Sequence, residues 1–215
     1  HLLDDLVVAT DSDRIADVVK SFGAEVIMTS VEHKTGTDRA YEAAKKFKKF
    51  SPDVVAIIWG DEPLYPASII DDCVKKLLDD PELVAVAAAD NITDPSMLGT
   101  DSVVKVVTDK DNRALYISRA LIPHWYKGNA PEYYHIIGAM VMRMDFLSKY
   151  VSMEQTPLEL IAAPPSELTV APRVIAVFVI PVCVGEARVG ITVAGVGVAV
   201  GVGVGAAASV FHTIA

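Results

Sequence analysis

Cysteine is scarce in this sequence, and its histidines never recur at a metal-binding spacing. Two cysteines among 215 residues are too few for a disulfide framework or a thiolate zinc site. The five histidines are scattered, without a His-x-His or His-x-x-x-His pair, so a metal centre built from histidine has no support. The low cysteine content fits a reducing compartment and no signal-peptide pattern is visible, so we expect a cytoplasmic protein.

An excess of basic residues is also lacking. The chain has 19 Lys and Arg against 28 Asp and Glu, a formal net charge of −9. Nucleic acids and anionic membranes are bound through clustered Lys and Arg, so neither is an expected partner. A nucleotide ligand is not excluded, because a phosphate site needs only a few local donors and often a metal. With 52% hydrophobic and 22% charged residues, the chain is predicted to fold around a sizeable core.

Charge nearly disappears from the C-terminal segment, residues 163–215. This segment holds only four charged residues, and Gly190 to Phe211 is a run of 22 residues without a charge. That length would suit a membrane span, but six glycines and Val-Gly alternation disfavour a helix. A glycine-rich pair of strands is a second interpretation, and a third is that this sequence departs from a natural one. We therefore treat 163–215 as a separate Val/Gly/Ala-rich segment of doubtful sequence and expect no function from it.

The first ninety residues alternate between apolar runs and helical patterns. The apolar runs predict strands at 6–10, 25–28, 54–59 and 83–89, and the helical patterns lie at 15–22, 37–50 and 67–78. The clusters Asp11-Ser12-Asp13 and Thr37-Asp38 are the expected helix caps. Strands that alternate with helices are typical of a parallel sheet covered on both faces. The fold class predicted is therefore α/β, with a mainly parallel sheet.

Beyond Asp90 the pattern becomes that of antiparallel strands. Two runs, 103–108 and 113–117, flank a turn-rich tetrapeptide and predict a hairpin, and 133–142 predicts a further strand. Short helices are expected at 146–151 and 157–161. The parallel core is thus predicted to carry a β-rich extension.

A glycine and two carboxylates follow the third predicted strand, in the order Gly60-Asp61-Glu62-Pro63. Ligand sites in open α/β sheets lie beyond the carboxyl ends of the strands. Asp61 at such a place suits Mg²⁺, which takes one or two protein carboxylates and further oxygens from phosphate. An acidic loop that caps the next helix is the alternative interpretation, and position alone does not separate the two.

Two further segments carry donors for an anion. In His33–Arg39, a glycine beside hydroxyl residues at a helix start offers backbone N–H groups and the positive end of the helix dipole. The segment lacks the first glycine of a Walker A loop. Arg119 follows Ser118 where a strand ends, and can clamp a carboxylate or a phosphate. An ordinary helix cap and a surface arginine are the respective alternatives.

In order and spacing, these motifs resemble those of one enzyme family. They are VATD (8–11), HxxGTDR (33–39), GDEP (60–63), VVKVVxDxxxxALYxSRxxIP (103–123) and TPLE (156–159). Together, over residues 5 to about 161, they resemble the cytidylyltransferases that make CMP-Kdo, where Kdo is the lipopolysaccharide sugar acid 3-deoxy-D-manno-octulosonate. The resemblance implies a Rossmann-like nucleotide-diphospho-sugar transferase fold over residues 1–162. It also implies that the β-rich extension, about 100–143, serves sugar binding and formation of a homodimer.

The implied reaction transfers CMP from CTP to Kdo and releases pyrophosphate, with Mg²⁺ as cofactor. By this resemblance Asp61 is the metal-binding aspartate and the residue expected to carry catalysis. The nucleotide-binding positions carried over are Thr37, Asp38, Arg39 and Gly60. The positions carried over to the sugar are Trp59, Glu62, Ser118, Arg119, His135 and Glu159.

Departures from the family pattern leave alternatives open. The family opens with a strand and an RLPGKP-type loop that holds the triphosphate, and this sequence starts after them. Trp59 stands where the family has Gln, and His135 is one residue further from Gly138 than in the family's His-x-Gly. No aspartate after Asp145 matches the family's second metal carboxylate. The alternatives are CMP transfer to another acidic sugar, a sialic or 8-amino ulosonic acid, or a homologue that binds nucleotide without turnover.

Overall fold

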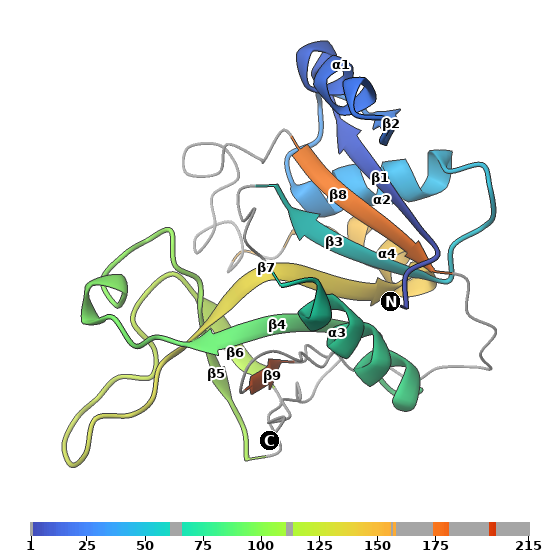
Figure 1. Ribbon diagram of the computed structural model, residues 1–215. Coiled ribbons are helices and arrows are strands. Elements are labelled where there is room, and N and C mark those ends of the chain that lie inside the picture. Colours follow the sequence, from blue (N-terminus) through green and yellow to red (C-terminus); the bar gives the residue numbers. More distant parts are fainter. Residues whose placement is uncertain are drawn as a thin grey trace. The chain divides into compact units, whose positions relative to one another are not determined.

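The computed structural model describes residues 2–60, 66–110, 114–155 and 157, and the backbone of the strands at 174–180 and 198–200. The chain divides into two compact units, whose helices and strands are drawn in Figure 1. The first unit comprises His1–Asp71 and Gly138–Gly185, and the second comprises Asp72–Ile137 and Glu186–Ala215. Each unit is described by itself.

The first unit carries three strands that follow one another in the sequence with helices between them. Its elements are β1 (Asp5–Thr10), α1 (Asp13–Ser21), β2 (Glu25–Met28), α2 (Gly36–Lys46), β3 (Val54–Trp59), α4 (Met144–Val151) and β8 (Val174–Ile180). The start of α3 (Ala67–Asp79) and most of β7 (Tyr134–Arg143) also belong to it. The α/β class predicted from the alternation is confirmed.

The strand pairing of this unit departs from a mainly parallel sheet. β1 pairs in parallel with β2, whereas β1 and β3 both pair antiparallel with β8, and β3 pairs antiparallel with β7. It follows that β1, β2 and β3 run in one direction, as predicted, and that β8 lies between β1 and β3 in the opposite direction (Figure 1). Of the predicted strands, β1 and β2 are therefore parallel neighbours, whereas β8 separates β1 from β3.

The core of the first unit follows from the apolar runs. Val7 and Ala9 of β1 and residues 54–57 of β3 are buried, as expected for strands covered on both faces. Helix α2 buries Ala40, Ala43 and Ala44, at the i, i+3, i+4 spacing of a helix face that packs on a sheet. These small side chains bring the helix backbone close to the sheet, and α2 packs against both β1 and β3.

The expected start of α1 is confirmed, whereas both expected ends of α2 are wrong. Ser12 holds the N-cap position of α1 without a side-chain cap bond, and Gly23 follows that helix at φ +82°. Helix α2 is capped by Thr35 rather than by Thr37 and Asp38. It ends at Lys46 rather than near residue 50, because Phe47 takes an extended conformation and its side chain is buried.

The second unit contains the antiparallel extension. Its elements are the rest of α3, β4 (Ala85–Asn91), the 3₁₀ turn η1 (Pro95–Met97), β5 (Lys105–Thr108), β6 (Ala114–Ser118), the first residues of β7 and β9 (Val198–Val200). β5 pairs antiparallel with β6 and with β7, so the predicted hairpin and its neighbouring strand are confirmed. β4 pairs antiparallel with β9.

Parts of the chain for which we made predictions lie outside the described residues. These parts are Asp61 to Tyr65, the turn residues 111–113, and the expected helix at 157–161 except for Pro157. Of the uncharged run from Gly190 to Phe211, only the strand β9 is described. No helix among the described residues is both long and apolar enough to cross a membrane.

Candidate functional site

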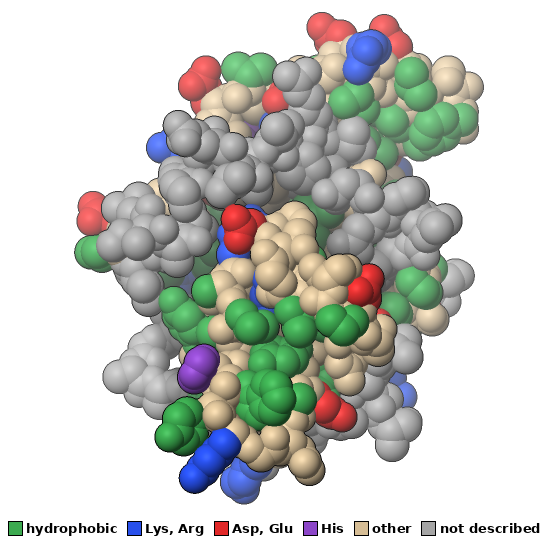
Figure 2. Space-filling model, turned by 90° about the vertical axis from the view of Figure 1, so that its left-hand side faces the viewer, with side chains coloured by type: hydrophobic (Ala, Val, Ile, Leu, Met, Phe, Trp, Pro, Cys, Tyr) green, Lys and Arg blue, Asp and Glu red, His purple; other side chains and the backbone are tan. Residues whose placement is uncertain are grey.

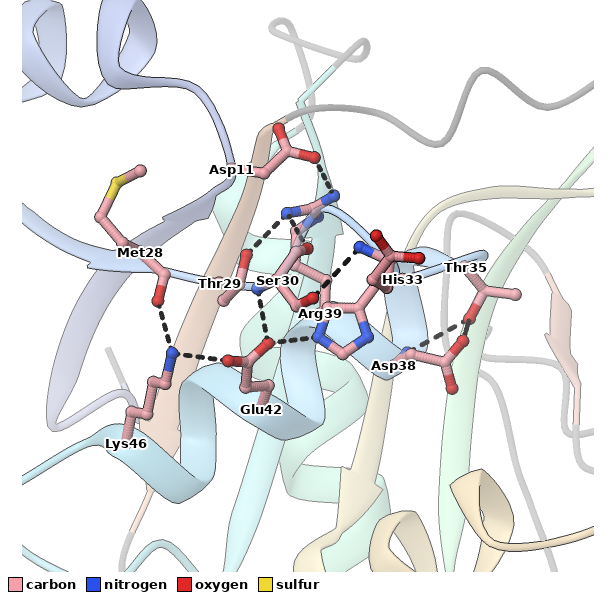
Figure 3. A network of polar contacts seen from close by, with 11 residues as sticks. Asp11, Met28, Thr29, Ser30, His33, Thr35, Asp38, Arg39, Glu42 and Lys46 are labelled. Carbon is pink, nitrogen blue, oxygen red and sulfur yellow. Dashed lines mark hydrogen bonds and ion pairs between the residues drawn. The ribbon is translucent and has the colours of Figure 1, made fainter.

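The start of helix α2 is capped by the side chain of Thr35. Thr35 Oγ1 accepts a hydrogen bond from the backbone N–H of Asp38 at 3.2 Å and donates one to Asp38 Oδ2 at 2.7 Å (Figure 3). Gly36 is buried, and Thr37 and Asp38 are half-buried. The first N–H groups of a helix carry partial positive charge and lack partners within the helix. This end of α2 therefore combines fixed backbone donors with hydroxyl and carboxylate groups from three neighbouring residues.

Arg39, one turn into α2, is buried and held by an ion pair. Its side chain is 2% exposed, and Nη2 donates to Asp11 Oδ2 at 2.7 Å. Nη1 donates to Thr29 Oγ1 at 2.6 Å and to the carbonyl of Ser30 at 3.5 Å (Figure 3). The buried Nε has no partner among the described residues. Arg39 thus ties the residue after β1 to the loop that leaves β2.

Glu42, one turn further along α2, accepts from three donors. Its Oε2 accepts from the backbone N–H of Ser30 at 2.8 Å and from Nε2 of His33, and its Oε1 pairs with Lys46 Nζ at 2.5 Å. Lys46 Nζ also donates to the carbonyl of Met28 at 2.9 Å (Figure 3). Burial raises the pKa of Glu42, but the bonds from Lys46, Ser30 and His33 and the charge of Lys46 outweigh it and lower the pKa to about 2. Glu42 is therefore a carboxylate at any working pH.

The lowered pKa of Glu42 predicts how stability changes in acid. A carboxyl whose folded pKa is below its ordinary value of 4.5 stabilises the folded state above that value, and the stabilisation is lost as pH falls toward 2. Urea unfolding at a series of pH values should show a decline of the unfolding free energy below pH 5 that is shallower in Glu42→Gln. The same change at Glu32, which is exposed on the neighbouring loop, should leave the slope as it is. Equal slopes in wild type and Glu42→Gln would contradict this assignment.

The second group of predicted site residues lies at the end of strand β3 and directly after it in the sequence. Trp59 is its last residue and is half-buried, and Gly60, which follows, is exposed. Asp61 and Glu62 come next in the sequence but lie outside the described residues, as does Glu159. Among the residues that the structure does describe, no cluster of three or more His, Cys, Asp and Glu side chains is arranged to hold a metal ion.

The second unit brings two predicted sugar-site residues into one row. Ser118 of β6 and His135 of β7 both lie opposite Lys105 of β5. Residues directly opposite one another on paired strands share a face of the sheet. Ser118, Lys105 and His135 therefore stand side by side on the same face of the extension, although Ser118 and His135 are 17 positions apart in the sequence.

Lys105 is fully buried, which no motif in the sequence predicts. Its Nζ donates to the carbonyl of Thr100 at 2.7 Å and to the carbonyl of Arg119 at 2.9 Å. Burial lowers the pKa of Lys105, the charge of Asp101 raises it, and the charge of Arg119 lowers it again. Arg119 in turn donates from Nη1 to the carbonyl of Asp101 at 2.6 Å. Two cations thus fix the chain where it leaves β6.

Three residues in these contact networks are not among the ligand-binding positions expected from the sequence. Asp11 is expected there as a helix cap, yet it pairs with Arg39. Glu42 and Lys105 look like ordinary surface charges. A signal was present for Glu42, because it lies three residues after Arg39 and four before Lys46, on one face of α2.

In α/β folds with an open sheet, ligands bind beyond the carboxyl ends of the strands. Residues 1–167 match the model of the family described as Cytidylyltransferase. This chain belongs to the cytidylyltransferase family.

Individual relatives agree with the family match. The 3-deoxy-manno-octulosonate cytidylyltransferase of Francisella tularensis subsp. tularensis (strain SCHU S4 / Schu 4) is 39% identical over 163 residues, which are 73% of this chain and 65% of the relative. That of Chlamydia felis (strain Fe/C-56) is 40% identical over 158 residues, 74% of this chain and 61% of the relative. The chain therefore spans slightly less than two thirds of the curated relatives that it matches.

A solved structure shares the fold. The structure of CMP:2-keto-3-deoxy-manno-octonic acid synthetase complexed with CTP is 30% identical to this chain, with a TM-score of 0.66. The match covers 74% of this chain and 64% of that chain. The Rossmann-like transferase fold implied by the sequence motifs is thereby confirmed.

Proposed function

We propose that this protein transfers CMP from CTP to Kdo, giving CMP-Kdo and pyrophosphate for the synthesis of lipopolysaccharide. The observation that carries the proposal is the family match over residues 1–167, since that range contains every motif from VATD to TPLE. Relatives named for this reaction, at 39% and 40% identity, support the substrates. The solved relative complexed with CTP supports the nucleotide.

In this proposal the start of α2 receives the nucleotide. Thr37 and Asp38 offer a hydroxyl and a carboxylate from the first turn, and Gly60 permits a close approach of the chain at the end of β3. Arg39 is engaged with Asp11 and Thr29, so its contribution is to hold the loop before α2. The Thr35 hydroxyl takes up the N–H of Asp38, and the other N–H groups of the first turn have no partner within the helix.

The proposed cofactor is Mg²⁺, held by Asp61. The donor set fits the ion, because Asp61 and Glu62 follow β3 in the sequence and carboxylate oxygens are the ligands that Mg²⁺ prefers. When bound, the ion would neutralise negative charge on the phosphate oxygens of CTP.

The sugar acid is proposed to bind at the extension. Ser118 and His135 offer a hydroxyl and an imidazole on one face, and Arg119 offers a guanidinium that matches a carboxylate. Buried Lys105 fixes the backbone of Arg119. Trp59, Glu62 and Glu159 complete the residues assigned to this substrate by the family motifs.

The proposed chemistry requires alignment more than covalent work by the protein. The anomeric hydroxyl of the sugar attacks the α-phosphorus of CTP, so a new oxygen–phosphorus bond forms while the bond to pyrophosphate breaks. Both reactants are anions, so the protein must bring like charges together and hold them in line. Measuring pyrophosphate release from CTP, ATP, GTP and UTP, each mixed with Kdo, tests the proposal. The proposal requires that, of these four nucleotides, only CTP gives release.

Replacing Arg119 by alanine should raise the KM for the sugar by about 10- to 100-fold, because a hydrogen bond to a charged group contributes about 1.5–3 kcal/mol. Arg119→Lys should recover only part of the loss, since an ammonium lacks the planar fork of a guanidinium. Steady-state kinetics with each substrate varied in turn measures the effect. A rise confined to the KM for CTP would place Arg119 in the other substrate's pocket.

Trp59 favours a second candidate substrate. An indole donates a hydrogen bond but cannot accept one, unlike the glutamine that the family motif carries before GDEP. A different acidic sugar, a sialic or an 8-amino ulosonic acid, would present different hydrogen-bonding groups to the side chain at this position. Comparing turnover of Kdo with that of these acids separates the candidates, and a preference of tenfold or more for another acid would replace Kdo in the proposal.

The proposed partner is a second copy of the chain. Apolar side chains gather on the face seen in Figure 2. Among the large apolar side chains that are exposed, five belong to β6 and the segment after it, namely Leu115, Tyr116, Leu121, Trp125 and Tyr126. A second copy of the chain would cover these side chains in a homodimer. Sedimentation equilibrium tests this proposal, and a monomer at every protein concentration would exclude the homodimer. The proposed location is the cytoplasm, in keeping with a sequence that holds only two cysteines.

A further inference from the structure

The loop from Thr29 to Thr35 lies between β2 and the first turn of α2. Val31 is 70% exposed, and Glu32 and Lys34 are also exposed, so the middle of this loop has no apolar anchor in the core. Ordering a backbone costs about 1–2 kcal/mol for each residue. Polar contacts must therefore decide which conformation the loop adopts.

Two side chains of α2 supply those contacts from one helix face. Glu42 accepts from the backbone N–H of Ser30 and from the ring of His33, and Arg39 donates to Thr29 Oγ1 and to the carbonyl of Ser30. Ser30 is thus held at its N–H by Glu42 and at its C=O by Arg39. We call these contacts of Arg39 and Glu42 with the loop the clamp. Lys46 adds a contact to the end of β2, because it binds both Glu42 and the carbonyl of Met28, the last residue of that strand (Figure 3).

We propose that Glu42 is a positioning residue for the nucleotide: by clamping Ser30 and His33 it sets the path of the loop into Thr35–Asp38. The inference rests on the proposed function, which assigns that segment to CTP. Each contact of Glu42 described above is made to the protein itself, so Glu42 acts through the loop.

The negative charge of Glu42 is what the clamp requires. A carboxylate accepts on both oxygens, and here it meets a backbone N–H, an imidazole N–H and an ammonium. The amide of glutamine has the same shape but only one accepting oxygen, so its NH₂ would oppose one of these donors. Glu42→Gln therefore changes the clamp while the helix and its packing are kept.

The test compares Glu42→Gln with Glu32→Gln, which makes the same chemical change at an exposed position of the loop. Calorimetric titration with CTP, KM values for CTP and for the sugar, and melting temperature are measured for both variants and the wild type. We expect Glu42→Gln to weaken CTP binding about tenfold, as the loss of one charge-assisted hydrogen bond would. The KM for the sugar should stay within about twofold, and Glu32→Gln should match the wild type.

Two results would overturn the inference. One is a folded Glu42→Gln variant that binds CTP as the wild type does. The other is an equal rise of both KM values with a fallen melting temperature, which a purely structural residue would give. A wild-type protein that does not bind CTP would remove the proposed function itself, and is thereby distinguishable from either result.

A second variant keeps the inference testable should Glu42→Gln fail to fold. His33→Ala removes one donor to Glu42, a half-buried side chain of the loop, and leaves α2 untouched. CTP binding about threefold weaker, with an unchanged KM for the sugar, would support the clamp. Unchanged CTP binding by this variant would overturn it.

Discussion

Replacing Asp61 by asparagine should reduce turnover by about 100-fold or more while the melting temperature stays close to that of the wild type. A metal ion contributes several kcal/mol to stabilising the charge of a transition state, and each 1.36 kcal/mol is tenfold in rate. Asparagine has the shape of aspartate without its charge, so it should weaken ion binding more than folding. In the sequence, Asp61 follows the end of β3, and ligands of α/β sheets bind beyond the carboxyl ends of the strands.

Rates measured over a range of Mg²⁺ concentrations make this test specific. Asp61→Asn should need more Mg²⁺ for half-maximal activity. Asp79→Asn is the matched control, because Asp79 is an exposed residue at the end of α3 and undergoes the same chemical change. A rate equal to that of the wild type at low Mg²⁺ would refute the metal-binding role of Asp61.

Replacing Arg39 by methionine should lower the unfolding free energy by about 3 kcal/mol, and should abolish tight CTP binding as well. The Arg39 side chain is 2% exposed and pairs with Asp11, and removal of one partner from a buried ion pair costs about 3–5 kcal/mol. Asp11 is 16% exposed, so water offsets part of the cost and the lower end of the range applies. The loop before α2 also loses its contacts to Thr29 and Ser30, which is why binding should suffer.

Urea unfolding measures the stability change, and Arg14→Met serves as its control because Arg14 is an exposed cation on α1. The double variant Asp11→Asn with Arg39→Met should be destabilised by less than the sum of the two single changes, since both remove the same pair. Additive losses, or a loss below 1 kcal/mol in Arg39→Met, would show that this pair does not hold the unit together.

The strands of the first unit were predictable because their signal is local. The runs at 6–10, 25–28 and 54–59 reappear as β1, β2 and β3 with bounds that agree within one residue. Helix ends were harder to predict. Lysines continue past residue 46, but α2 ends there because the side chain of Phe47 turns into the core. The ring centroids of Phe47 and Phe50 are 5.0 Å apart.

The place of β8 could not be predicted from sequence. Residues 174–180 are a plain apolar run within a segment of otherwise low information, and nothing local says which strands such a run will pair with. It pairs with both β1 and β3, more than a hundred residues away. Pairing partners of this kind depend on the packing of the whole unit rather than on hydrophobic pattern.

Some residues of the candidate site could be proposed from the sequence, and others became evident only in the structure. Thr37, Asp38 and Ser118 could be proposed because hydroxyl and carboxylate groups stand at element ends in a recognisable order. Glu42 and Lys105 were not proposed, because a charged residue in a helix or a hairpin is usually solvated. Their roles come from partners distant in sequence, such as Ser30 for Glu42 and Arg119 for Lys105.

The most direct test of the central claim is to mix the full-length protein with CTP, Kdo and Mg²⁺ and to quantify CMP-Kdo and pyrophosphate together. The account predicts one pyrophosphate for each CMP-Kdo formed, no product when either substrate is left out, and no product with ATP, GTP or UTP. A folded protein that binds CTP tightly but forms neither product with Kdo or any other ulosonic acid would contradict it, and would mark a nucleotide-binding homologue without turnover.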